Sequence, residues 1–273
     1  LSYNRVMKKI TKISIQKKAG RYNIDLDNQF AFGVAESVLI KFGLAKGREL
    51  DDELIAEIKH NDSIAKALSI ALNFLSHSLH TVKQVKQKMS EKEVSESIQD
   101  EVVAQLYEQK YIDDLNYAQH YVSTKKIISP KGPNVIKMDL KQAGVNDDDI
   151  ETALSDYTHE EQIEIAEKLA LKSATTYKRE STRAKKQKIV QALATKGFSF
   201  DIAEIVVDRV IAENDDEIEL ENIKRQAEKS WRRYRNEVPS QRIYKTKNSL
   251  YTKGYNAELI NVVIHELEVS ADD

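Results

Sequence analysis

A short segment of the form Leu-x-x-x-Gly occurs three times in the second half of the chain. The copies are Leu140 to Gly144, Leu193 to Gly197 and Leu250 to Gly254, so their glycines are 53 and 57 residues apart. Each copy ends a stretch with helical periodicity, and glycine is suited to the left-handed conformation that closes a helix. An apolar residue follows every glycine, and the residues after the second and third copies also match. The chain is therefore predicted to repeat one helical unit.

A further unit precedes these three and lacks the glycine, running from Thr81 to Met89 and then from Val94 to Leu106. The chain is therefore predicted to contain four three-helix units in all. Units this small are expected to stack on their neighbours. The predicted fold is all-α, an elongated, curved array of tandem three-helix repeats. A compact all-α bundle with accidental glycine caps is the alternative. The expected divisions are an N-terminal extension at 1–50, then repeats at 51–112, 113–157, 158–213 and 214–273, the last with an acidic tail.

The first fifty residues have a different period. Ile13 and Ile15, then Tyr22, Ile24 and Leu26, alternate with polar residues on either side of a turn at 18–20, which predicts a small β-hairpin. Residues 30–34 either extend the hairpin or pack beneath it, and a short helix follows. An isolated hairpin is marginal in water, so this segment should pack on a helix.

The composition excludes several kinds of chemistry. The 273 residues contain no cysteine, which removes disulfides, thiolate metal sites and thiol nucleophiles. No nucleotide-binding glycine loop and no metalloprotease or serine hydrolase motif is found. We therefore expect a protein that is not an enzyme, with no catalytic residues, metal or cofactor. No run of apolar residues exceeds three, so neither a membrane span nor a signal peptide is expected, and a cytoplasmic location is predicted.

The net charge of −2 conceals separate basic and acidic segments. Residues 1–21, 178–196 and 224–253 carry net charges of +7, +6 and +8, whereas acids gather at 147–151, 213–221 and 266–273. This pattern creates local positive faces suited to phosphate, or else ordinary solvated helix faces. Trp231 and Tyr234 suit base stacking or core packing equally. The candidate contacts with DNA are Lys178, Arg179, Arg183, Lys185, Lys186, Lys188, Arg232, Arg233, Arg235, Arg242, Lys245 and Lys247. They predict binding that is blind to base sequence.

Residues 109–154 contain a distinctive set of acidic, aromatic and glycine positions, namely Asp113, Asp114, Tyr117, Ala118, Tyr121, Val122, Lys131, Gly132, Pro133, Leu140 and Gly144. In these positions the segment resembles the central signature of the RecX family. The resemblance covers most of residues 60–268 and is most specific at 107–154. It is weaker in the first unit, where Gln84-Val85 stands at a position that is often acidic and no glycine follows Met89. The signature residues have core and helix-capping spacing, so we expect them to be structural.

The resemblance implies a negative regulator of the RecA recombinase. Members of this family are similar in having tandem three-helix repeats that lie along the groove of the RecA–DNA filament. There they inhibit ATP hydrolysis, strand exchange and the co-protease activity that triggers the SOS response, and promote disassembly. The implied partners are the RecA nucleoprotein filament and single- or double-stranded DNA, and a monomer is expected. Two alternatives remain open from the residues alone, a DNA-binding protein independent of RecA and a helical scaffold or adaptor.

Overall fold

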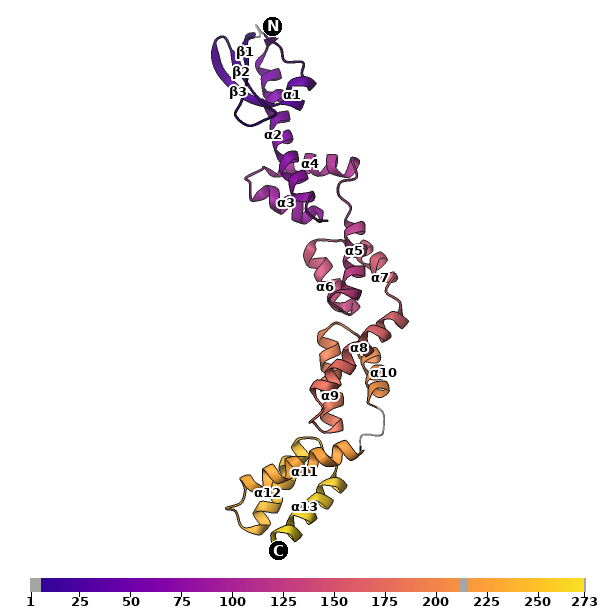
Figure 1. Cartoon of the computed structure of the whole chain (residues 1–273). Helices are drawn as coiled ribbons and strands as arrows, with labels where there is room; N and C mark the ends of the chain where they lie inside the picture. Colours follow the sequence, from indigo (N-terminus) through magenta and orange to yellow (C-terminus); the bar gives the residue numbers. More distant parts are fainter. Residues whose placement is uncertain (1–5, 212–215, 273) are drawn as a thin grey trace, which may run out of the picture. The chain divides into compact units, whose positions relative to one another are not determined.

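The structure is a computed structural model that describes residues 6–211 and 216–272 (Figure 1). Its strands are β1 (Lys8–Ile15), β2 (Arg21–Leu26), β3 (Gln29–Ala35) and β4 (Glu49–Leu50). The helices of the N-terminal half are α1 (Glu36–Lys41), α2 (Asp52–Leu75), α3 (Val82–Ser90), α4 (Glu96–Glu108), α5 (Asp114–Ile127) and α6 (Pro133–Ala143). Those of the C-terminal half are α7 (Asp147–Ser155), α8 (His159–Thr176), α9 (Thr182–Thr195), α10 (Phe200–Val210), α11 (Asp216–Arg233), α12 (Pro239–Thr252) and α13 (Ala257–Asp272).

The N-terminal extension is a four-stranded antiparallel sheet, larger than the hairpin expected. Its strand order is β3-β2-β1-β4. Asp27 and Asn28 adopt positive φ angles of 50° and 69°, which allow the tight turn that adds β3. The two-residue β4 then pairs with the start of β1, Lys8 opposite Leu50. One face of the sheet packs on α1 and the start of α2, as the instability of an isolated hairpin requires.

Asp62 on α2 connects this sheet to the helix beneath it. Its carboxylate, 4% exposed, accepts two hydrogen bonds from the Arg21 guanidinium, both at 3.0 Å. The Ala35 amide donates at 2.8 Å, and the Lys66 ammonium lies 2.8 Å away. Burial raises the pKa of Asp62, but the bonds from Arg21, Lys66 and the amide outweigh it and lower the pKa overall. The charged carboxylate therefore stabilises the junction.

The helices begin and end where the sequence places capping residues. Thr81 and Thr158 each form a capping box, at the starts of α3 and α8. Gly144, Gly197 and Gly254 have φ angles of +94°, +94° and +88° and follow α6, α9 and α12. The predicted left-handed glycine caps are confirmed.

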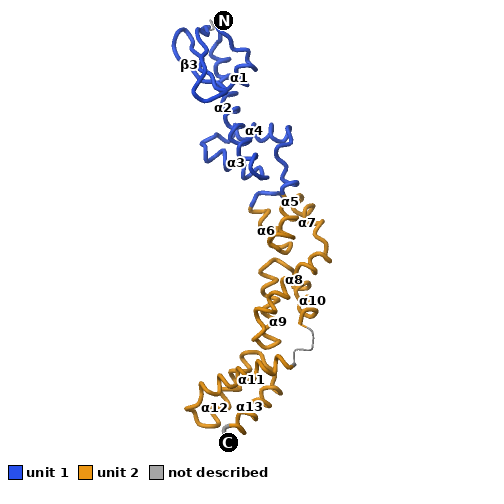
Figure 2. Tube along the Cα trace, in the orientation of Figure 1, with its two compact units in different colours: residues 1–117, 143–146 blue, residues 118–142, 147–273 orange. Residues whose placement is uncertain are grey.

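The chain divides into two compact units (Figure 2). The first holds residues 1–117 and 143–146, and the second holds 118–142 and 147–273. In the first unit α2 packs against α3 and α4; in the second, α8 to α10 form one three-helix group and α11 to α13 another. Helical repeats behind a small N-terminal sheet are thus confirmed, whereas the repeat boundaries and the curvature of the array stay predictions. Part of the acidic segment 213–221 lies outside the described residues. None of the described helices has the length and apolarity needed to cross a bilayer.

Candidate functional site

Two of the three glycine caps contact a helix start through a hydroxyl group. The Thr81 hydroxyl, at the start of α3, donates to the Ala143 carbonyl at 2.6 Å, just before Gly144. The Ser181 hydroxyl, at the start of α9, donates to the Lys253 carbonyl at 2.6 Å, just before Gly254. Both hydroxyls also accept from an amide of their own helix. We call each such contact between a helix start and a glycine cap a joint.

The third joint uses backbone alone. The Gly132 amide donates to the Lys196 carbonyl at 2.8 Å, and the Asn134 amide donates to the Gly197 carbonyl at 3.1 Å. A Cβ at position 132 would lie 2.3 Å from the carbonyl carbon and oxygen of Gly197. Glycine is therefore required here for close approach, and Pro133 then occupies the first position of α6, where no amide is needed.

The other signature residues also make structural contacts. Asp113 accepts from the Asn116 amide at 2.9 Å and so caps α5. Asp114 accepts from the Val82 amide at 2.9 Å, which connects α5 to α3. Ala118 is fully buried on the inner face of α5, and Tyr117, next to it, is half-buried. None of these positions presents an unsatisfied reactive group.

Tyr121 takes part in the one polar network that the signature builds in the described part of the second unit. Its hydroxyl donates to Asp139 on α6 at 2.8 Å, and the Lys131 ammonium lies 2.6 Å from the same oxygen. Burial raises the pKa of Asp139, but the bonds from Lys131 and Tyr121 reverse the effect and lower it. The carboxylate thus fixes the segment before Gly132 against α6.

The first group of candidate cations lies on the turn between α8 and α9 and along α9. Lys178, Arg179 and Arg183 are exposed, whereas Lys185 is only 6% exposed and so is not displayed at the surface. The expectation that Lys185 contacts phosphate is corrected on this ground, because its α9 position faces the interior beside Ile189. Lys186 and Lys188 are already paired with carboxylates, Asp208 at 3.0 Å and Glu180.

The second group lies at the end of α11 and on α12. Arg232 pairs with Glu228 at 3.1 Å and Lys245 with Glu237 at 2.5 Å, while Lys247 donates to Asn261 at 2.8 Å. Arg242 lies 4.1 Å from the ring centroid of Trp231 and donates to its carbonyl at 3.0 Å. Trp231 is thereby covered by a guanidinium group, which favours packing over base stacking. Arg233 lies 5.8 Å from the Tyr234 ring, and Arg235 is exposed after the helix.

Uncompensated positive charge in the two groups is consequently smaller than the sequence indicates. In the described parts of the chain, the candidates whose side chains have no hydrogen bond, ion pair or ring contact are Lys178, Arg179, Arg183 and Arg235. Arg183 also packs at a joint, because its Cβ lies 3.5 Å from where a Gly254 Cβ would stand. Glu180, Glu228 and Glu237 are already subtracted in the segment charges of +6 and +8, whereas Asp208 lies outside both basic segments and was therefore missed.

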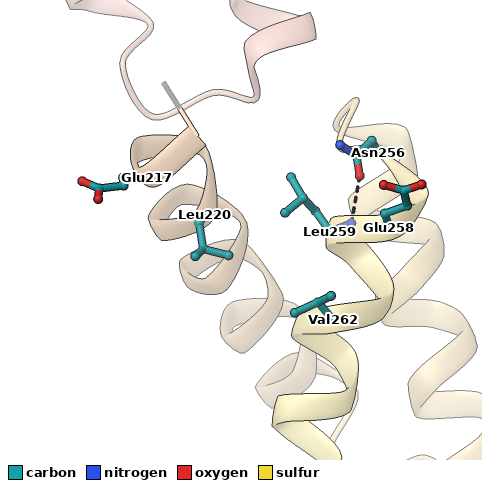
Figure 3. Close-up of a pocket in the computed structure, with 6 residues that line it drawn as sticks. All are labelled: Glu217, Leu220, Asn256, Glu258, Leu259 and Val262. Atoms are coloured by element: carbon teal, nitrogen blue, oxygen red, sulfur yellow. Dashed lines mark hydrogen bonds between the residues drawn. The ribbon is translucent and has the colours of Figure 1, made fainter. Parts of the chain in front are cut away.

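A cavity of about 510 Å³ separates the start of α11 from that of α13 (Figure 3). Leu220, Leu259 and Val262 point into it; Glu217 and Glu258 are also among its lining residues, and the carboxylate of Glu217 points away from α13. Asn256 accepts from the Leu259 amide at 2.8 Å and so caps α13. An apolar hollow between acidic side chains suits a side chain that is itself apolar and basic. Among the described residues, no group of three potential ligands is placed to hold a metal ion.

We compared the chain with known protein families. The Regulatory protein RecX N-terminal domain matches residues 8–51, and the first and second RecX three-helix domains match 67–106 and 113–154. The third matches twice, at 160–207 with 216–264. The chain belongs to the RecX family. The resemblance found in the sequence is confirmed, and the family is one of regulatory proteins.

Relatives extend over nearly the whole chain. The regulatory protein RecX of Leuconostoc citreum is 60% identical over 262 residues, covering 96% of this chain and 98% of the relative. That of Bacillus subtilis is 40% identical, covering 95% and 98%. Among solved structures, one titled regulatory protein RecX is 44% identical with a TM-score of 0.66 and covers 74% of this chain and 99% of that chain. RecX from Lactobacillus salivarius is 40% identical with a TM-score of 0.53 over 55% of this chain and 97% of that chain.

Proposed function

We propose that this chain is a negative regulator of the RecA recombinase. It binds in the groove of the RecA–DNA filament, inhibits ATP hydrolysis, strand exchange and SOS co-protease activity, and promotes disassembly of the filament. The observation that carries the proposal is 60% identity over almost the full length to a regulatory protein RecX. We further propose that it acts in the cytoplasm as a monomer and as a binding protein, without catalysis of its own.

Two different surfaces of the second unit support two different contacts, one with DNA and one with RecA. The exposed cations Lys178, Arg179 and Arg183 lie together around the turn that leads into α9. Phosphate contacts made by such side chains are independent of base sequence and weaken with salt. The residues that line the apolar cavity between α11 and α13 instead include the acids Glu217 and Glu258. We propose that the cations contact filament DNA and that the cavity receives a basic, apolar side chain of RecA.

The test is the ATPase activity of RecA on single-stranded DNA, with this protein added below the RecA concentration. We expect hydrolysis to fall, because one bound molecule would disfavour the extended filament over several protomers. Unchanged hydrolysis would refute the proposal. Inhibition that disappears when excess bare DNA is supplied would instead identify a DNA-binding protein that acts by competition alone.

A variant pair separates a regulator from a passive scaffold. Arg179→Glu with Arg183→Glu reverses two free cations, whereas Lys168→Glu with Lys172→Glu makes the same charge change on the exposed face of α8. The first pair should weaken inhibition of RecA and lower its salt dependence, and the second should have little effect. Equal behaviour of the two pairs would contradict the assigned DNA-facing surface.

A further inference from the structure

A second cluster of cations lies in the first unit, in a groove far in the sequence from the candidates above. The groove has a volume of about 520 Å³ and is formed by the β1–β2 turn, the last turns of α2 and the end of α3. It is lined by Lys18, Ser69, Ile70, Asn73, Phe74, His77, Lys88 and Lys92. None of these described lining residues is acidic.

The cations of the groove are available to a ligand to different degrees. Lys88 pairs with Glu91 at 2.8 Å, and its ammonium lies 5.9 Å from the centroid of the Phe74 ring. Lys18 and Lys92 are exposed, and in the described part of the chain neither ammonium has a hydrogen bond or an ion pair within 4 Å. Three segments therefore bring three cations to a single hollow: Lys88 is ion-paired with Glu91, Lys92 interacts with the same carboxylate only at longer range, and Lys18 has no ion pair.

The remaining lining groups complement these charges. Ser69 and Asn73 lie one turn apart on α2, and His77 follows in the turn after the helix, where its Nδ1 is hydrogen-bonded to the Ser76 hydroxyl. Ile70 and Phe74 form a partly buried apolar strip beside them; one face of the Phe74 ring is occupied by His80, which stacks on it at 3.7 Å between ring centroids, so a ligand base would meet Ile70 and the rest of the Phe74 ring. Cations beside polar donors suit phosphodiester oxygens, and an adjoining aromatic and aliphatic strip suits an unstacked base. Bases of a duplex are stacked inside and cannot reach such a strip, so the groove favours a single strand.

We propose that this groove binds single-stranded nucleic acid, with Lys18 and Lys92 contacting backbone phosphates and the Ile70–Phe74 strip contacting a base. The site lies entirely within the first unit and uses none of the cations of α9 and α12. It requires no RecA, so binding is measured with DNA alone and its failure would leave the RecA assays untouched.

The measurement is the affinity for a fluorescein-labelled oligothymidylate over a range of salt concentrations. In single strands each phosphate contact contributes a slope of about 0.7 in log K against log salt, which corresponds to about fivefold in affinity at ~0.1 M salt. Lys18→Gln with Lys92→Gln should therefore weaken binding by about 25-fold at that salt and lower the slope by about 1.4. Lys46→Gln with Lys110→Gln removes two other exposed lysines of the same unit and should change neither quantity appreciably.

Because the chain has no cysteine, a single introduced thiol reports on the groove directly. Ser69→Cys lies in its wall and should be protected from a thiol reagent by the oligonucleotide, whereas Ser97→Cys, exposed on α4, should react at an unchanged rate. Equal losses of affinity in the two lysine pairs, or no protection at position 69, would overturn the proposal. Protection by duplex DNA or by a polyglutamate peptide as effective as that by oligothymidylate would overturn it as well.

Discussion

The substitution Gly132→Ala tests how tightly the backbone of Gly132 packs against that of Gly197 in the third joint. The new Cβ would lie 2.3 Å from the carbonyl carbon and oxygen of Gly197 and 2.4 Å from the Phe198 nitrogen. All three are backbone atoms, so no side-chain rotation relieves the overlap. Overpacking of this kind costs about 1–3 kcal/mol. Separation of the two segments would also remove the hydrogen bonds from the amides of residues 132 and 134, at about 1 kcal/mol each.

The expected loss is thus about 3–5 kcal/mol of stability in the second unit, adding the packing and hydrogen-bond costs. Urea unfolding of the full chain measures it, and hydrogen exchange at amides 132 and 134 shows whether the joint opens locally. Gly20→Ala is the matched control, because Gly20 has a φ of +73° and open space around it. That control should lose only the left-handed backbone cost of about 1–2 kcal/mol. A loss below about 1 kcal/mol for Gly132→Ala, with both amides still protected, would refute the packing argument.

Three further outcomes follow from the contacts described. Asp62→Ala should destabilise the first unit by about 3–5 kcal/mol in chemical unfolding, because the largely buried Arg21 guanidinium is left without its carboxylate. The pKa of Asp62 is lower in the folded than in the unfolded state, so its contribution to stability is complete above about pH 4 and is lost as pH falls through the folded pKa. The free energy of unfolding of the variant should therefore fall less steeply at acid pH than that of the parent protein. Ser181→Ala should cost about 1–2 kcal/mol by removing a helix cap and the bond to Lys253; unaltered melting would contradict the joint. Tyr121→Phe should raise the pKa of Asp139 in a carboxyl titration by NMR, because one of its stabilising hydrogen bonds disappears.

Periodicity and glycine placement predicted the helical units well, because both depend on neighbours within one helix. The same local reasoning underestimated the N-terminal sheet. Residues 29–35 extend it, but β4 consists of only Glu49 and Leu50 and pairs with Lys8 and Lys9 about forty residues away. A strand of two residues is too short to show an alternating pattern of apolar and polar residues. It can be recognised only in the folded chain, where Leu50 is buried in the core.

The candidate site was harder to predict for a related physical reason. A run of lysines shows how much charge a segment has but not which carboxylates fold against it. Lys186 contacts Asp208 on the next helix, and Lys245 contacts Glu237, which lies in the α11–α12 turn. The burial of Lys185 could be anticipated only from its spacing, four residues before the core position Ile189. The number of lysines and arginines in a segment therefore overestimates its phosphate-binding surface wherever a neighbouring segment supplies carboxylates that pair with them.

The joints and the exposed cations of the second unit are connected by the chain itself. Arg183 stands two residues after Ser181, and its side chain packs beside Gly254. A change that opens this joint would therefore displace Arg183 even though the arginine is intact. The three joints achieve the same contact with a threonine hydroxyl, a glycine amide and a serine hydroxyl, so the docking geometry is retained while the chemistry varies. Repetition of one docking geometry is what a regulator needs if each unit is to meet an equivalent position of a partner that itself repeats.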